Sequence, residues 1–182
     1  LIVRDTIADV FIGEVKRIAD RLIVGGPGDD PIPFMGPMID NDTADGLAES
    51  FLALMSHGGR PVKHLIRPDL DMPFIAPGII DVTNMTERPD LELFGPLLQI
   101  IRVGTFEDAV AEANNTRFHR TAALIGGTRE QFDLFWANSR AGVVNWNNVT
   151  HEVNGNGPVA GNGLSGNHRA GGYYTADSVA FP

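Results

Sequence analysis

The segment Glu92–Pro96, which reads Glu-Leu-Phe-Gly-Pro, combines a carboxylate, an aromatic ring and a rigid backbone. It comes just before an apolar run that begins at Leu97, so a strand would hold these side chains at the rim of a sheet. A carboxylate there can accept two hydrogen bonds from a ribose diol, and an aromatic ring two residues on can pack on a flat heterocycle. On the residues alone, a turn at the start of a strand is the simpler explanation, because it needs the same Gly-Pro pair.

Two other patterns that can carry chemistry have simpler explanations. Residues 161–166 match G-x-G-x-x-G, but a dinucleotide-binding motif follows a strand, opens a helix and precedes an acidic residue on a second strand, for which this chain ends too soon. A tight glycine loop is therefore favoured over a pyrophosphate site. No two of the histidines have the i, i+4 spacing of a helical zinc site, so we expect no metal centre; they are His57, His64, His119, His151 and His168.

Strand and helix patterns alternate along most of the chain, which predicts an α/β fold. The run Leu97–Val103 is nearly continuous in apolar residues, as in a parallel strand covered on both faces. Thr6 is predicted to cap the first helix, and Thr128 with Gln131 is predicted to form a capping box for a later one. We therefore expect a layered, mostly parallel sheet with helices on both faces.

The composition is that of an ordinary globular protein. Hydrophobic residues make up 43% of the 182 residues, and the formal charge of −9 comes without any cluster of Lys and Arg, so we expect no nucleic-acid partner. The apolar stretches are too short for a membrane span, and the absence of cysteine is compatible with a cytoplasmic protein. The chain opens on the apolar run Leu1–Val3 without a Met, so we expect residues to be missing upstream.

Several motifs together resemble the aldehyde dehydrogenase family. Glu92–Pro96 resembles the E-x-F-G-P signature of that family, and further similar segments follow in the family's order over essentially the whole chain, at residues 36–39, 77–82, 114–118 and 141–147. More narrowly, residues 165–169 and 173–177 resemble the subfamily that oxidises succinylglutamate semialdehyde in arginine catabolism.

The resemblance implies that this chain is the carboxy-terminal, catalytic-domain portion of a homo-oligomeric, NAD-dependent oxidoreductase that acts on a small aldehyde. In that family a cysteine thiolate attacks the aldehyde, and hydride then passes to the nicotinamide. Since this chain contains no cysteine, we expect it to be inactive by itself.

The resemblance also assigns roles to particular positions. Glu92 would hold the nicotinamide ribose, and Phe94 would contact the nicotinamide ring. The loop from residue 151 to 161 would form part of the wall of the aldehyde tunnel, with His151, Asn154 and Val159 as its candidate residues. Val159 and the alanine after it stand where the family usually has Phe-Gly.

Residues 1–147 are predicted to form the catalytic α/β domain. Residues 148–182 are predicted to form the Gly-rich tunnel loop and a carboxy-terminal segment through which copies associate. Two alternatives stay open. One is a self-associating structural or binding module that uses a sheet edge and this tail. The other is a pseudoenzyme that retains only the cofactor contacts of Glu92 and Phe94.

Overall fold

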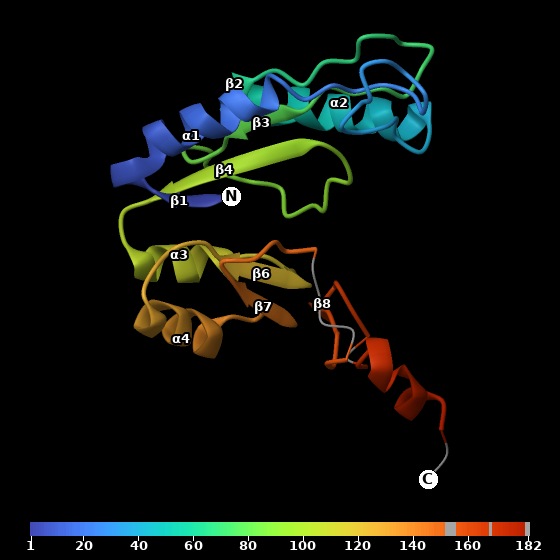
Figure 1. Ribbon diagram of the computed structural model, residues 1–182. Coiled ribbons are helices and arrows are strands. Elements are labelled where there is room, and N and C mark those ends of the chain that lie inside the picture. Colours follow the sequence, from blue (N-terminus) through green and yellow to red (C-terminus); the bar gives the residue numbers. More distant parts are fainter. Residues whose placement is uncertain (152–155, 168, 181–182) are drawn as a thin grey trace. The chain divides into compact units, whose positions relative to one another are not determined.

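The computed structural model describes residues 1–151, 156–167 and 169–180. The chain forms two compact units, Leu1–Thr105 (unit 1) and Phe106–Pro182 (unit 2), and most of their elements are labelled in Figure 1. The boundary between these units lies at residue 105. The predicted division into a catalytic α/β domain up to residue 147 and a tunnel and association segment after it stays a prediction.

Unit 1 is built around strand β4 (Leu97–Val103). This strand pairs in parallel with β1 (Ile2–Arg4) on one side and with β3 (Gly78–Asp81) on the other, and β2 (Arg60–Lys63) joins β3 in antiparallel pairing. The resulting order β1-β4-β3-β2 is a mostly parallel sheet. The predicted α/β class and the predicted bounds of the central strand are therefore confirmed.

Two helices cover opposite faces of this sheet, α1 (Asp5–Ala19) and α2 (Asn41–Ser56). Ile79 and Ile80 are neighbours on β3, so their side chains point to opposite faces. Ile79 belongs to the apolar cluster formed with α1, and Ile80 belongs to the cluster formed with α2. Both side chains are at most 2% exposed, so the sheet is covered on both faces at this point, as predicted.

The two helices begin in different ways. Helix α1 begins at Asp5, directly after β1, with Arg4 as its N-cap residue and no side-chain cap. The prediction that Thr6 caps this helix is wrong, because the chain leaves the strand without a loop and Thr6 already lies in the first turn. Helix α2 is capped by Asp40, whose carboxylate accepts a hydrogen bond of 2.8 Å from the Thr43 amide.

A partly buried ion pair joins β3 to β4 on the face that α1 covers. The Asp81 carboxylate accepts hydrogen bonds from Arg102 Nε at 2.9 Å, from the Thr83 hydroxyl at 2.6 Å and from the Thr83 amide at 3.0 Å. Arg102 also lies 2.7 Å from Asp9 of α1. Burial raises the pKa of Asp81, but the hydrogen bonds from Thr83 and the charge of Arg102 outweigh it, so the net pKa lies below its ordinary value.

Unit 2 contains a parallel βαβ arrangement. Strands β6 (Thr121–Leu124) and β7 (Val143–Trp146) pair in parallel, and helix α4 (Arg129–Asn138) connects them. Strands β5 (Phe118–His119) and β8 (Asn162–Gly163) form a separate antiparallel pair. The remaining bounds are α3 (Phe106–Ala113) and the 3-10 helix η1 (Gly172–Ser178).

Helix α4 is fixed to unit 2 at its start and along one side. The predicted capping box is confirmed: the Thr128 hydroxyl accepts from the Gln131 amide at 3.3 Å, and the Gln131 side chain accepts from the Thr128 amide at 2.9 Å. Phe132 stacks on Trp146 of β7 with ring centroids 5.1 Å apart, and Trp146 Nε1 donates to the Gly126 carbonyl at 2.9 Å.

We predict that Asp81→Asn lowers the free energy of unfolding of unit 1 by about 2 kcal/mol, because Arg102 loses its buried counter-charge. The folded-state pKa of Asp81 lies below the unfolded-state value. Ionised Asp81 therefore stabilises the fold above pH about 4, and this contribution disappears as the pH falls through the folded-state pKa. Urea unfolding between pH 7 and 2, followed by far-UV circular dichroism, should show that the free energy of unfolding falls more steeply with acid in the parent than in Asp81→Asn.

An exposed control, Glu87→Gln, should follow the parent. Equal pH dependence of the free energy of unfolding in all three proteins would contradict the prediction.

We also predict that Thr128→Ala lowers the local stability of α4 by about 1 kcal/mol, because one amide at the helix start loses its acceptor. Thr128→Ser keeps the hydroxyl and should stay close to the parent. Amide hydrogen exchange across residues 129–138 measures the effect. Equal protection of this helix in the alanine and serine variants would show that the capping box does not stabilise it.

Candidate functional site

The predicted cofactor contacts lie in the loop from residue 82 to residue 96, which joins β3 to β4. The Leu97 amide donates to the Gly95 carbonyl at 2.8 Å, and the Pro96 carbonyl accepts from the Gly78 amide at 2.9 Å. Gly78 and Leu97 are also register partners in the parallel pairing of β3 with β4. The end of the loop is therefore held at the amino-terminal edge of the sheet.

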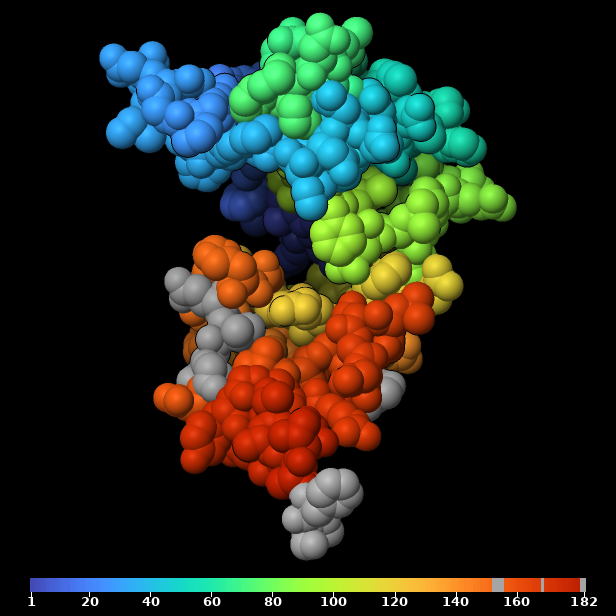
Figure 2. All heavy atoms as spheres, turned by 90° about the vertical axis from the view of Figure 1, so that its right-hand side faces the viewer, coloured from blue at the N-terminus to red at the C-terminus, as the bar shows by residue number. Residues whose placement is uncertain are grey.

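Glu92 and Phe94 are both exposed on this loop, which is the yellow-green segment at the surface of unit 1 in Figure 2. The Phe94 side chain is 73% exposed and offers an accessible ring face. Within the described residues, no hydrogen bond or ion pair engages the Glu92 carboxylate. A carboxylate with unused acceptors and an aromatic ring two residues away suit a ribose diol and a flat heterocycle in chemical type.

Leu93, between these two residues, is partly buried and packs against the apolar clusters that α2 forms. The sequence patterns single out Glu92 and Phe94 but not Leu93. Leu93 is an apolar residue between two polar or exposed ones, and alternate side chains of an extended segment point to opposite sides. This pattern could have identified Leu93 as the residue that packs the loop against α2.

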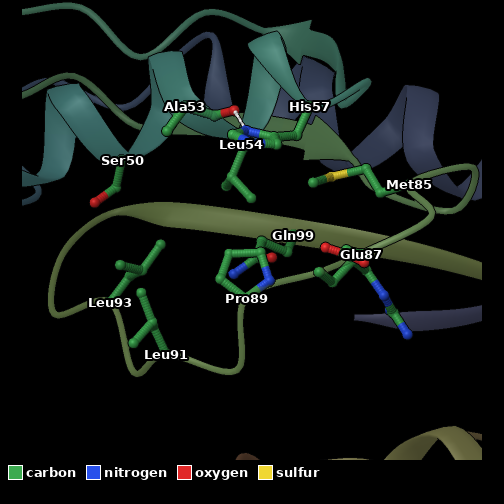
Figure 3. Close-up of a pocket in the computed structure, with 11 residues that line it drawn as sticks. Ser50, Ala53, Leu54, His57, Met85, Glu87, Pro89, Leu91, Leu93 and Gln99 are labelled. Carbon is green, nitrogen blue, oxygen red and sulfur yellow. Dashed lines mark hydrogen bonds between the residues drawn. The ribbon is translucent and has the colours of Figure 1, made fainter.

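A cavity of about 350 Å³ lies between α2 and this loop, as Figure 3 shows. Leu91 and Leu93 line it from the loop, whereas Glu92 and Phe94 are absent from its lining. The loop therefore lines the cavity with both apolar and charged side chains, but its two candidate cofactor contacts are not among them. The other lining residues are Ser50, Ala53, Leu54, His57, Met85, Glu87, Arg88, Pro89 and Gln99.

The candidate tunnel residues belong to unit 2. His151 is exposed, and Val159 is half-buried and pairs with Gly171, whose amide donates to the Val159 carbonyl at 2.6 Å. Asn154 lies outside the described residues. Glu92 and Phe94, in contrast, belong to unit 1, and the roles of both groups of residues stay predictions.

The glycine-rich segment 161–166 forms a tight loop, as predicted. A Cβ at Gly161 would overlap the Ser165 carbonyl, and a Cβ at Gly166 would overlap the Gly161 carbonyl. Strand β8 lies inside the segment, and no helix opens in it. Across the described ranges, no group of three or more His, Cys, Asp or Glu side chains could hold a metal ion. None of the helices in those ranges is both long and apolar enough to cross a bilayer.

Two curated relatives match the whole chain. N-succinylglutamate 5-semialdehyde dehydrogenase from Sphingopyxis alaskensis is 60% identical over 182 residues, and the protein of the same name from Novosphingobium aromaticivorans is 59% identical over the same length. The chain spans only 38% and 39% of the lengths of these two relatives. It therefore corresponds to a little over a third of each of them.

Solved structures of aldehyde dehydrogenases share the fold. An indole-3-acetaldehyde dehydrogenase from P. syringae, solved with NAD+ and IAA, aligns over 97% of this chain with a TM-score of 0.87 and 27% identity, and 36% of that chain is covered. Betaine aldehyde dehydrogenase from Staphylococcus aureus aligns over 97% of this chain, and 36% of its own, with a TM-score of 0.86 at 22% identity. A sequence profile described as the aldehyde dehydrogenase family matches residues 1–180. The motif, the layered sheet and this match over nearly the full length establish that the chain belongs to the aldehyde dehydrogenase family.

Proposed function

We propose that this chain is part of an NAD-dependent aldehyde dehydrogenase that oxidises succinylglutamate semialdehyde to the corresponding acid. The observation that carries the proposal is the 60% identity, over all 182 residues, to a relative named for that substrate. A second relative of the same name is 59% identical over the same length. The proposed substrate is an aldehyde of the whole enzyme, of which this chain supplies one portion.

Glu92 and Phe94 are the proposed cofactor contacts. When bound, NAD supplies the nicotinamide ring that accepts hydride. The Glu92 carboxylate accepts hydrogen bonds from the ribose hydroxyls, and the exposed Phe94 ring packs against the nicotinamide and limits its rotation. Support comes from the exposure of both side chains and from the NAD+ in the P. syringae structure with the same fold.

Unit 2 is proposed to contribute residues to the aldehyde tunnel of the whole enzyme. His151, Asn154 and Val159 contribute to the wall of the aldehyde tunnel, and the segment after residue 172 associates with a second copy in a homo-oligomer. Tyr173, Tyr174 and Val179 in that segment are exposed, which leaves apolar surface for such a contact. The proposal includes a cytoplasmic location, as expected for a catabolic oxidoreductase without cysteine pairs.

We predict that the purified chain alone does not oxidise aldehydes. It has no cysteine to form a thiolate nucleophile, and serine hydroxyls substitute poorly. Absorbance at 340 nm, recorded with NAD+ and succinylglutamate semialdehyde, should stay flat. The full-length Sphingopyxis alaskensis relative, assayed with the same reagents, is the positive control. Turnover by the chain alone would overturn the assignment of the nucleophile to residues outside it.

We further predict that the chain retains weak affinity for NAD+ and that Glu92→Ala reduces it about tenfold, because hydrogen bonds to a charged acceptor are lost. Saturation-transfer NMR with NAD+ measures both affinities. The matched control is Glu87→Ala, since Glu87 is an exposed glutamate on the same loop that lines the cavity near α2. Equal losses in the two variants would contradict a specific role for Glu92.

A further inference from the structure

Gly95 lies directly against helix α2. A Cβ added at this position would overlap Leu47 Cδ2 and would stand 3.0 Å from Met38 Cε. Leu47 is itself 4% exposed and belongs to the apolar cluster that includes Ala44 and Ile75. The α2 side chain cannot easily move away, because well-packed interiors have little spare volume. An added methyl group would therefore force Leu47 or the loop to move.

The loop is fixed at neighbouring points as well. On the upstream side, Leu93 packs into the same α2 clusters. On the downstream side, the Pro96 carbonyl and the Leu97 amide make the hydrogen bonds that start β4. Glu92 and Phe94 stand next to these anchors, so the position of their backbone is set by α2 and by the sheet.

The start of α2 is held in turn by a buried arginine. The Arg67 side chain is 5% exposed, and its guanidinium donates to Asn41 Oδ1 at 2.9 Å and to the Leu70 carbonyl at 2.8 Å. It also pairs with Asp45 of α2. The first turns of α2, which lead to Leu47, are therefore anchored to Arg67 through Asn41 and Asp45.

We infer that Leu47 and Gly95 are positioning residues for the two proposed cofactor contacts, Glu92 and Phe94. The Leu47 side chain packs against the loop backbone at Gly95 and thereby sets the positions of the carboxylate and the ring. The effect of this packing on cofactor binding rests on the proposed function. The positioning of the loop by Leu47 does not, because it concerns only the contact between α2 and the loop. A misplacement of about 1 Å at such a contact can reduce a reaction rate about a hundredfold, so the position of the loop matters for function.

The first test is Gly95→Ala, followed by two-dimensional NMR of the labelled chain. The added methyl group should push the loop away from Leu47, so the backbone amide resonances of Glu92 and Phe94 should shift. Gly36→Ala is the matched control, because nothing lies within 4 Å of a Cβ at Gly36. In that variant the resonances of the loop should stay in place. Unshifted Glu92 and Phe94 resonances in Gly95→Ala would overturn the inference.

Rescue separates positioning from general destabilisation. The double variant Leu47→Ala/Gly95→Ala makes room for the added methyl group and should return the Glu92 and Phe94 resonances toward their parent positions. Leu54→Ala/Gly95→Ala is the control, because Leu54 is an equally buried α2 leucine that is not among the nearest neighbours of Gly95. It should not rescue. If both doubles behave alike, the contact has only a structural role.

The affinity for NAD+ provides a second readout. Gly95→Ala should raise the dissociation constant about tenfold relative to the parent, and the Leu47→Ala double variant should recover most of that loss. If the parent chain binds no NAD+, the cofactor proposal fails, while the resonance shifts and their rescue still decide the positioning role.

If Gly95→Ala does not fold, Leu47→Met is the alternative variant, because it conserves volume and changes the same contact. Unchanged resonances at Gly95 and Phe94 in that variant would also overturn the inference.

Discussion

The structure of unit 1 depends on a strand that has to be covered on both of its faces. β4 pairs in parallel on each side, and the residues of the β3–β4 pair alternate between the α1 face and the α2 face. Neither helix can be displaced without exposing one face of this pair to water. The same pairing brings Asp81 and Arg102 together under α1 and places the end of the β3–β4 loop at the sheet edge beside α2.

Local patterns were sufficient to predict the elements but not all of their ends. An apolar run bounded by Pro96 and a glycine gives the central strand its full length, and the Thr128–Gln131 spacing gives the start of α4, because both signals lie within a few residues. The start of α1 was predicted incorrectly. A strand that passes into a helix without a loop has no capping side chain to recognise, which is why the cap predicted at Thr6 is not used.

Long-range contacts are the part of the site that the sequence could not predict. Glu92 and Phe94 are predicted as cofactor contacts by resemblance and chemical type; both are exposed, and their role stays a prediction. The approach of Gly95 to Leu47 joins residues far apart in the chain, and no periodic pattern encodes it. The same holds for the hydrogen bonds of Arg67 to α2, since a lone arginine in a loop gives no indication of the carbonyl and carboxylate groups around it.

The stacking of Phe132 on Trp146 has a practical consequence for spectroscopy. The chain has two tryptophans, Trp136 and Trp146, and both belong to unit 2. Trp136 is 62% exposed, whereas Trp146 is held between an aromatic ring and a backbone carbonyl. Intrinsic tryptophan emission therefore reports on the surroundings of two side chains in unit 2, whereas unit 1 contains no tryptophan of its own and needs a probe introduced there.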